Sequence, residues 1–291
     1  MDLKWDYPSF DPNSIIQMNT YVIQGKSGLP VSFDIDFPNQ DKAPVILFLH
    51  GFKGFKDWGA WPLLAKYLAS KGFGVIRMNF SHNGTNPENP VDFVDLEAFG
   101  NNTFTNETQD VQDILNWLEN KTELHTKLDL NQINVLGHSR GGAIAIITAI
   151  EDDRIKKIAT LSGVGKLDRY TEQELAHWKK EGVVYMLNGR TNQNMPLYYS
   201  LAEDYLKNES RFNLDLIMEK LGQPYLVIHA EEDETVHLSE GEKLAKLGKN
   251  ATLKVIKGAN HSFGGGHPYL ADKLPEDTLK AGNLTAEFFK K

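Results

Sequence analysis

The chain has no cysteine among its 291 residues. This absence excludes disulfides, thiolate metal sites and a cysteine nucleophile, so any chemistry must depend on serine, histidine and carboxylate side chains. No apolar run is long enough to cross a membrane, and 41% hydrophobic with 24% charged residues is ordinary for a soluble globular protein. Lysine and arginine form no cluster and the net charge is -8, which argues against a nucleic-acid partner.

The start of the chain, MDLKWDYPSFDPNS, carries acidic residues and prolines. A secretory signal would need a basic patch followed by an apolar block. We therefore expect a cytoplasmic protein without a membrane partner.

Apolar runs of strand length alternate along the chain with amphipathic stretches of helix length. This alternation predicts an α/β fold with a doubly wound, mostly parallel sheet of eight strands. The first two strands are expected to form an antiparallel hairpin. The predicted strands cover residues 19–24, 31–37, 45–51, 74–80, 133–137, 155–163, 224–230 and 251–257. The predicted helices cover residues 61–70, 106–120, 143–150 and the C-terminus from about 279.

Residues from about 166 to 222 interrupt the alternation. The segment has a helical pattern, shows no strand and is rich in tyrosine and tryptophan. A connection of this length can be a cap over a site, a second small domain, or a packing element at the sheet edge. We expect one domain over residues 1–291, with this segment as a helical cap.

The sequence GHSRG, residues 137–141, places Ser139 between two glycines, directly after a predicted buried strand and before a predicted helix. A serine hydroxyl becomes a useful nucleophile only when a base removes its proton and donors stabilise the resulting oxyanion. A tight turn at the end of a strand can present the serine in this way, and only small residues fit beside it. Ser139 is therefore the predicted nucleophile.

Backbone amides are expected to form the oxyanion hole. The helix after Ser139 directs its N-terminus at the site and offers the N–H of Arg140. The strand ending LFLHG is followed by Phe52, whose N–H is the second predicted donor. His50, just before this loop, is predicted to be structural.

The base and its orienting acid are expected later in the chain, each after a strand and in the order serine, acid, histidine. Asp233 follows the strand PYLVIHA, and His261 follows the last strand. Glu231 and Glu232 are rival acids, but they follow the strand too closely to reach back over the site. His237 and His267 are rival histidines, and a lone histidine is more often a structural residue.

Together GHSRG, HGFKG, HAEEDETV and GANHSF resemble the α/β-hydrolase superfamily, in particular its dienelactone-hydrolase-like and cinnamoyl (feruloyl) esterase-like branches. The likeness runs from about Val31 to the C-terminus. It implies a serine hydrolase with Ser139, Asp233 and His261 as catalytic triad and the amides of Phe52 and Arg140 as oxyanion hole. In the acid motif Ala230 replaces the family's glycine.

The leading hypothesis is a carboxylic ester hydrolase that acts on a small-molecule ester without a metal or organic cofactor. A serine peptidase or acyl-peptide hydrolase would use the same machinery, although the large N-terminal domain of the oligopeptidases is missing. A non-catalytic binding protein of the same fold is the third hypothesis. A homodimer is compatible with the sequence.

Overall fold

The computed structural model describes residues 17–291, so the opening segment from which a cytoplasmic location is predicted lies outside the described residues. An eight-stranded sheet forms its centre, in the order β1-β2-β4-β3-β5-β6-β9-β10. β1 pairs antiparallel with β2 and β2 antiparallel with β4, whereas the other neighbours are parallel. These strands are β1 (Gln17–Gln24), β2 (Pro30–Phe37), β3 (Ala43–Leu49), β4 (Gly74–Asn79), β5 (Leu128–His138), β6 (Ile155–Leu161), β9 (Tyr225–Ala230) and β10 (Ala251–Ile256). The predicted sheet and its N-terminal hairpin are confirmed.

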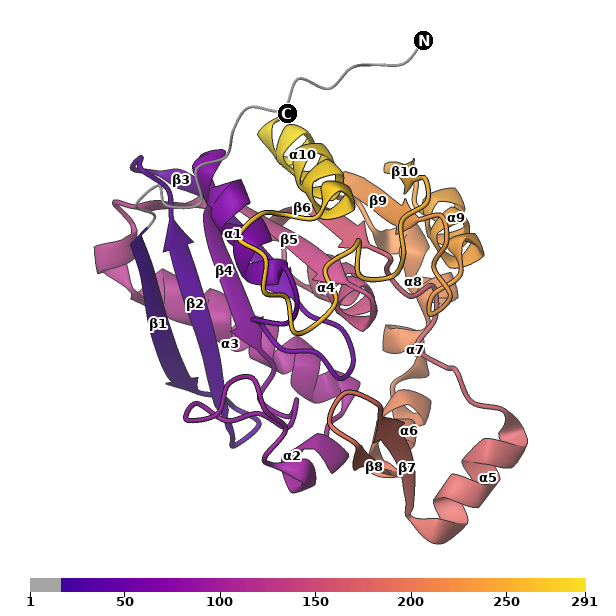
Figure 1. Cartoon of the computed structure of the whole chain (residues 1–291). Coiled ribbons are helices and arrows are strands. Elements are labelled where there is room, and N and C mark those ends of the chain that lie inside the picture. Colours follow the sequence, from indigo (N-terminus) through magenta and orange to yellow (C-terminus); the bar gives the residue numbers. More distant parts are fainter. Residues whose placement is uncertain (1–16) are drawn as a thin grey trace.

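Helices cover both faces of the sheet (Figure 1). One face packs against α1 (Trp61–Ser70) and α10 (Glu276–Lys290), and the other against α3 (Phe104–Asn120), α4 (Arg140–Glu151) and α9 (Leu238–Leu247). Side chains of β3 alternate between the two layers, with Val45 and Leu47 on one side and Ile46 and Phe48 on the other. Burial on both faces explains why the central strands are apolar almost throughout.

Residues 166–222 differ from expectation, because they are not wholly helical. They contain a two-stranded antiparallel sheet that pairs with no other strand among the described residues. The segment holds α5 (Glu172–Glu181), β7 (Val183–Asn188), β8 (Gln193–Tyr198), α6 (Ser200–Lys207), α7 (Glu209–Phe212) and α8 (Leu214–Ile217). Figure 1 shows α5, β7 and β8 together at the far end from α10. The β7–β8 hairpin is short and half exposed, so it lacks the strong apolar pattern of the central strands.

Shorter helices complete the chain: α2 (Leu96–Gly100), η1 (Thr122–Leu124) and η2 (Met218–Lys220). Within residues 17–291 no helix has the length and apolarity needed to cross a membrane. The same residues contain no group of three or more histidine and carboxylate side chains placed to hold a metal ion.

Candidate active site

Ser139 lies in the turn between β5 and α4, with φ 54° and ψ -120°. Residues other than glycine rarely adopt a positive φ, so the turn is strained. Its two glycines are required by close contacts between chain segments. A Cβ on Gly137 would lie 2.3 Å from the carbonyl oxygen of Gly141, and one on Gly141 would lie 2.3 Å from that of Leu49. The turn therefore holds Ser139 at the carboxyl end of β5 and at the N-terminus of α4.

Two free backbone amides flank this serine. The loop after β3 passes so close that a Cβ on Gly51 would lie 2.8 Å from the Cβ of Ser139. Within residues 17–291 neither the N–H of Phe52, in this loop, nor that of Arg140, at the first position of α4, donates a hydrogen bond. Unpaired amides beside a nucleophile are the donors that an oxyanion needs.

His50 anchors this loop through two hydrogen bonds of its ring. Its Nδ1–H donates to the carbonyl of Gly51 at 2.8 Å, and its Nε2 accepts from the amide of Phe80 at 3.3 Å. Burial lowers the pKa of His50 to about 4, so the ring stays neutral. These contacts give His50 the structural role that the sequence predicts.

Asp233 and His261 meet at the same edge of the sheet. The Nδ1–H of His261 donates to Oδ2 of Asp233 at 2.7 Å. The amides of Thr235 and Val236 donate to the other carboxylate oxygen at 2.9 and 2.8 Å. Burial alone would raise the pKa of Asp233, but the hydrogen bonds from His261 and Val236 outweigh it and lower the pKa to about 2. The carboxylate is therefore ionised at neutral pH and holds the proton of His261 on Nδ1.

Three of the four rival residues, Glu231, Glu232 and His237, line neither of the cavities beside Ser139. Glu231 and Glu232 are exposed, and Glu231 accepts the amide of Gly258 at 3.1 Å. His237 is exposed at the start of α9. His267 does border the site: its Nδ1 accepts the amide of Gly59 at 3.0 Å, and its ring stacks near Trp58. The loop after His261 thus forms one wall of the site.

His138 connects the nucleophile strand to the loop of the candidate base, a role that sequence reasoning missed. Its Nε2–H donates to the backbone carbonyl of His261 at 3.0 Å, and the two rings lie 4.7 Å apart. Burial lowers the pKa of His138 to about 3, which keeps the ring neutral beside His261. Its place directly before Ser139 was the only sequence signal.

Glu107 on α3 is a second residue that sequence reasoning missed, and it contacts the side chain of Arg140. The guanidinium of Arg140 pairs with the buried Glu107 and lies 4.6 Å from the ring centre of Phe52. Burial raises the pKa of Glu107, while the charge of Arg140 opposes that rise. This contact joins α3 to the first turn of α4 and to the loop after β3 that contains Phe52, called the oxyanion loop after its predicted role.

Two cavities open on either side of Ser139. The first, of about 400 Å³, is called the Trp58 cavity, and the second, of about 330 Å³, the Tyr170 cavity. Phe52, Ser139, Met186 and Thr235 line both. The Trp58 cavity also has His50, Gly51, Lys53, Gly54, Trp58, Trp61, His138, Asn188, Arg190, His261 and His267. The Tyr170 cavity also has Phe104, Arg140, Val164, Lys166, Leu167, Arg169, Tyr170, Leu201 and Val236.

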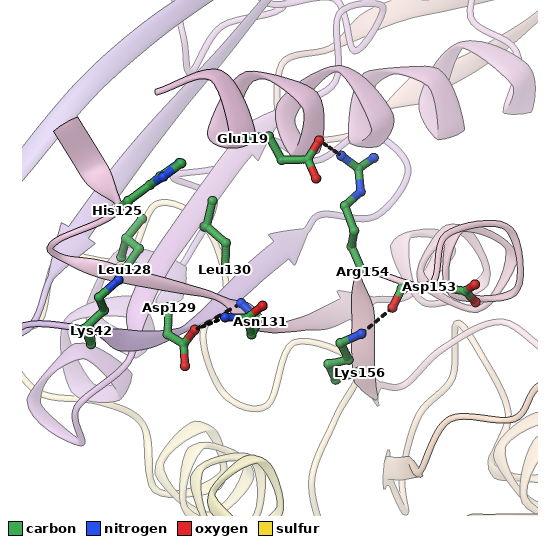
Figure 2. A pocket seen from close by; sticks show the side chains of 10 residues that line it. All are labelled: Lys42, Glu119, His125, Leu128, Asp129, Leu130, Asn131, Asp153, Arg154 and Lys156. Carbon is green, nitrogen blue, oxygen red and sulfur yellow. Dashed lines mark hydrogen bonds and ion pairs between the residues drawn. The ribbon is translucent and has the colours of Figure 1, made fainter. Parts of the chain in front are cut away.

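A larger groove, of about 630 Å³, lies at the other end of the sheet, around the starts of β5 and β6 (Figure 2). It contains neither the serine nor the histidine of the candidate site. Its charged side chains largely contact protein groups: Arg154 pairs with Glu119, and Lys156 donates to the backbone carbonyl of Asp153 at 2.6 Å.

The comparisons with known proteins agree with this architecture. The model of the alpha/beta hydrolase fold family matches residues 44–184. With the sheet and helices described above, the chain has the alpha/beta hydrolase fold. Human Protein ABHD12B is 24% identical over 213 residues, which are 73% of this chain and 52% of that protein. The chain therefore matches about half the length of this relative.

Solved structures share the fold at low sequence identity. The alpha/beta hydrolase GrgF from Penicillium sp. sh18 superposes with a TM-score of 0.72 at 13% identity, covering 94% of this chain and 98% of that one. Est1E from Butyrivibrio proteoclasticus, solved with ferulic acid bound, has a TM-score of 0.68 at 18% identity, covering 93% and 98%. Identities this low establish the shared fold and no more.

Proposed function

We propose that the protein is a serine hydrolase that cleaves carboxylic esters through an acyl-enzyme intermediate. The observation that carries the proposal is the 2.7 Å hydrogen bond between His261 and an ionised Asp233. His261 lines the same cavity as Ser139. The name of Est1E and its bound ferulic acid support an ester substrate, because this chain has the same fold.

In the proposed reaction Nε2 of His261 removes the proton of Ser139 as its Oγ attacks the ester carbonyl. The amides of Phe52 and Arg140 stabilise the oxyanion, and the dipole of α4 adds to this effect. His261 then donates the proton to the departing alcohol. Water, activated by the same imidazole, cleaves the acyl-enzyme and restores the free serine. Asp233 stabilises the imidazolium that forms in each half of the reaction.

The test replaces Ser139 with alanine. We expect Ser139→Ala to lower kcat on p-nitrophenyl butyrate by at least roughly 10³-fold and to abolish labelling by a fluorophosphonate probe. The matched control, Ser70→Ala at the exposed end of α1, should keep wild-type activity. The melting temperature of Ser139→Ala should stay close to the wild-type value. Serine and alanine both have a Cβ, so the substitution adds no strain at the positive φ of this position.

Aminoacyl p-nitroanilides test the peptidase alternative in the same assay. Faster cleavage of anilides than of esters would replace the esterase proposal by a peptidase. Folded wild-type protein that hydrolyses neither substrate and is not labelled at Ser139 would instead support a non-catalytic binding protein.

A further inference from the structure

The two cavities at Ser139 have an unusual charge. Five cationic side chains line them, namely Lys53, Arg140, Lys166, Arg169 and Arg190, and no aspartate or glutamate does. The whole chain carries a net charge of -8, so this local excess runs against the overall composition. Arg140 and Arg169 pair with Glu107 and Glu240 outside the cavity walls. The remaining three cations have no ion-pair partner among residues 17–291.

Two of these unpaired cations, Lys53 and Arg190, belong to the Trp58 cavity. Arg190 lies in the turn of the β7–β8 hairpin, where its guanidinium packs over the rings of Phe55 and Phe93 at 5.5 and 5.6 Å. These contacts hold the cation near the cavity while no carboxylate of the described chain neutralises it. Its donors are therefore available to a ligand.

Asn188 adds an unused donor to the same wall. Its Oδ1 accepts the amide of Arg190 at 3.2 Å, which identifies the other amide atom as Nδ2. Asn188 is 6% exposed, and its Nδ2 is buried without a hydrogen-bond partner among the described residues. A buried donor that is left unpaired destabilises the protein. An oxygen of a bound ligand would remove that cost.

Aromatic rings form another part of the Trp58 cavity. Trp58 and Trp61 form part of its wall, and the ring of His267 stacks near Trp58 at 6.1 Å with an interplanar angle of 26°. Burial and the charge of Arg190 lower the pKa of His267, although the charges of Asp92 and Asp57 oppose this shift. Flat ring surfaces suit an aromatic or other cyclic group.

The position of His261 indicates which half of an ester enters this cavity. His261 lines the Trp58 cavity but not the Tyr170 cavity. In the proposed function this imidazole must donate its proton to the departing alcohol oxygen, so the alcohol has to leave on the side of His261. The acyl group then extends into the Tyr170 cavity, whose wall is mostly apolar.

We propose that the Trp58 cavity binds the alcohol half of an ester whose alcohol is a ring compound carrying a carboxylate, with Arg190, Lys53 and Asn188 as its donors. This inference rests on the proposed function for the direction in which the substrate lies. Each donor is contributed by a loop: Lys53 by the oxyanion loop, and Asn188 and Arg190 by the turn region of the inserted hairpin.

The test compares two butyrate esters with the same shape. One has para-(hydroxymethyl)benzoate as its alcohol and the other the neutral para-(hydroxymethyl)benzamide. We expect the wild-type kcat/KM to be roughly tenfold higher for the anionic ester, the size of one charge-assisted hydrogen bond. Arg190→Gln should remove most of this preference, measured as the ratio of the two kcat/KM values within the same variant. Lys254→Gln, which removes one positive charge from exposed β10, should keep the preference.

Equal kcat/KM values for the two esters in the wild type would overturn the inference, as would a preference that Arg190→Gln leaves intact. Hydrolysis of p-nitrophenyl butyrate but of neither test ester would also overturn the inference. If p-nitrophenyl butyrate is not hydrolysed either, the proposed function fails, and the cavity is tested by calorimetric titration of para-(hydroxymethyl)benzoate itself. Binding that weakens roughly tenfold in Arg190→Gln but not in Lys254→Gln would support an anion site. No binding to the wild-type protein would overturn it.

Discussion

The cavities at Ser139 and the groove in Figure 2 lie at opposite ends of one sheet, and the charged side chains that line them differ in sign. The groove is lined by three lysine or arginine residues, Lys42, Arg154 and Lys156, and by three carboxylates, Glu119, Asp129 and Asp153. The cavities are lined by five cations and no carboxylate. Charges of both signs can satisfy one another within the protein, whereas unpaired charges of one sign are better satisfied by a ligand. The groove is larger than either cavity, so size and unpaired charge point to different ends of the sheet.

The largest expected effect concerns the one carboxylate that the candidate chemistry uses. In Asp233→Asn, Oδ1 can keep the amides of Thr235 and Val236, so Nδ2 must face His261. An amide donates there, which forces the imidazole proton onto Nε2, the atom that has to accept the serine proton. We expect kcat on p-nitrophenyl butyrate to fall by roughly 10³- to 10⁴-fold.

The control for this variant is the melting temperature, which shows whether the fold survives. A loss of activity below tenfold in a folded variant would contradict the proposed role of Asp233. Ester hydrolysis would then not require the negative charge of Asp233.

A smaller effect is expected when the charge difference between the two regions is removed. Met186 lines both cavities and is 38% exposed, so Met186→Glu places a carboxylate at Ser139 without opening the core. We expect kcat/KM for the benzoate ester to fall roughly tenfold through repulsion, and for the benzamide ester by less than about threefold. Asn131→Asp adds the same charge to the groove of Figure 2 and should change neither value. Equal losses for both esters would contradict the prediction.

The smallest effect concerns Asp110, a buried carboxylate on α3. Burial raises the pKa of Asp110 to about 8, although a hydrogen bond from the amide of Ser81 opposes the rise. An unfolded aspartate titrates near pH 4, so between about pH 4 and 8 the folded protein holds a proton that the unfolded chain has lost. The free energy of unfolding therefore decreases as the pH rises through this window.

Asp110→Asn removes this titration. We expect the melting temperature of the wild type to fall, relative to that of the variant, by roughly 5 °C between pH 4 and 8. Thermal unfolding across this pH range measures the difference. A constant gap between the two proteins would show that Asp110 does not hold its proton.

The candidate site residues named from the sequence are those whose signal is local. Ser139 could be predicted because two glycines are needed where chain segments touch, and the contacts at Gly137 and Gly141 are of this kind. Asp233 and His261 each follow a strand of the parallel sheet, and the carboxyl ends of parallel strands meet at one edge. The hydrogen bond between them therefore follows from the order of elements.

The inserted segment was harder to predict, because its signals are weak or distant. β7 has the β-branched and aromatic start VVY, but half of its residues are exposed, and β8 contains Pro196, which disfavours a strand. The packing of Arg190 on Phe55 and Phe93 joins residues that lie 135 and 97 positions apart, and no local pattern reports such a contact. The contacts of His138 with His261 are equally remote in sequence.

The β7–β8 hairpin is bonded to no strand of the main sheet among the described residues, yet it brings Met186, Asn188 and Arg190 to the walls beside Ser139. Mutations in the hairpin can therefore accumulate with little effect on the strand registry that brings Ser139, Asp233 and His261 to one edge of the sheet. Selectivity and reactivity are separately evolvable in such a molecule. Exchanging these few residues would change which ligands the walls beside Ser139 accept and would leave the main sheet intact.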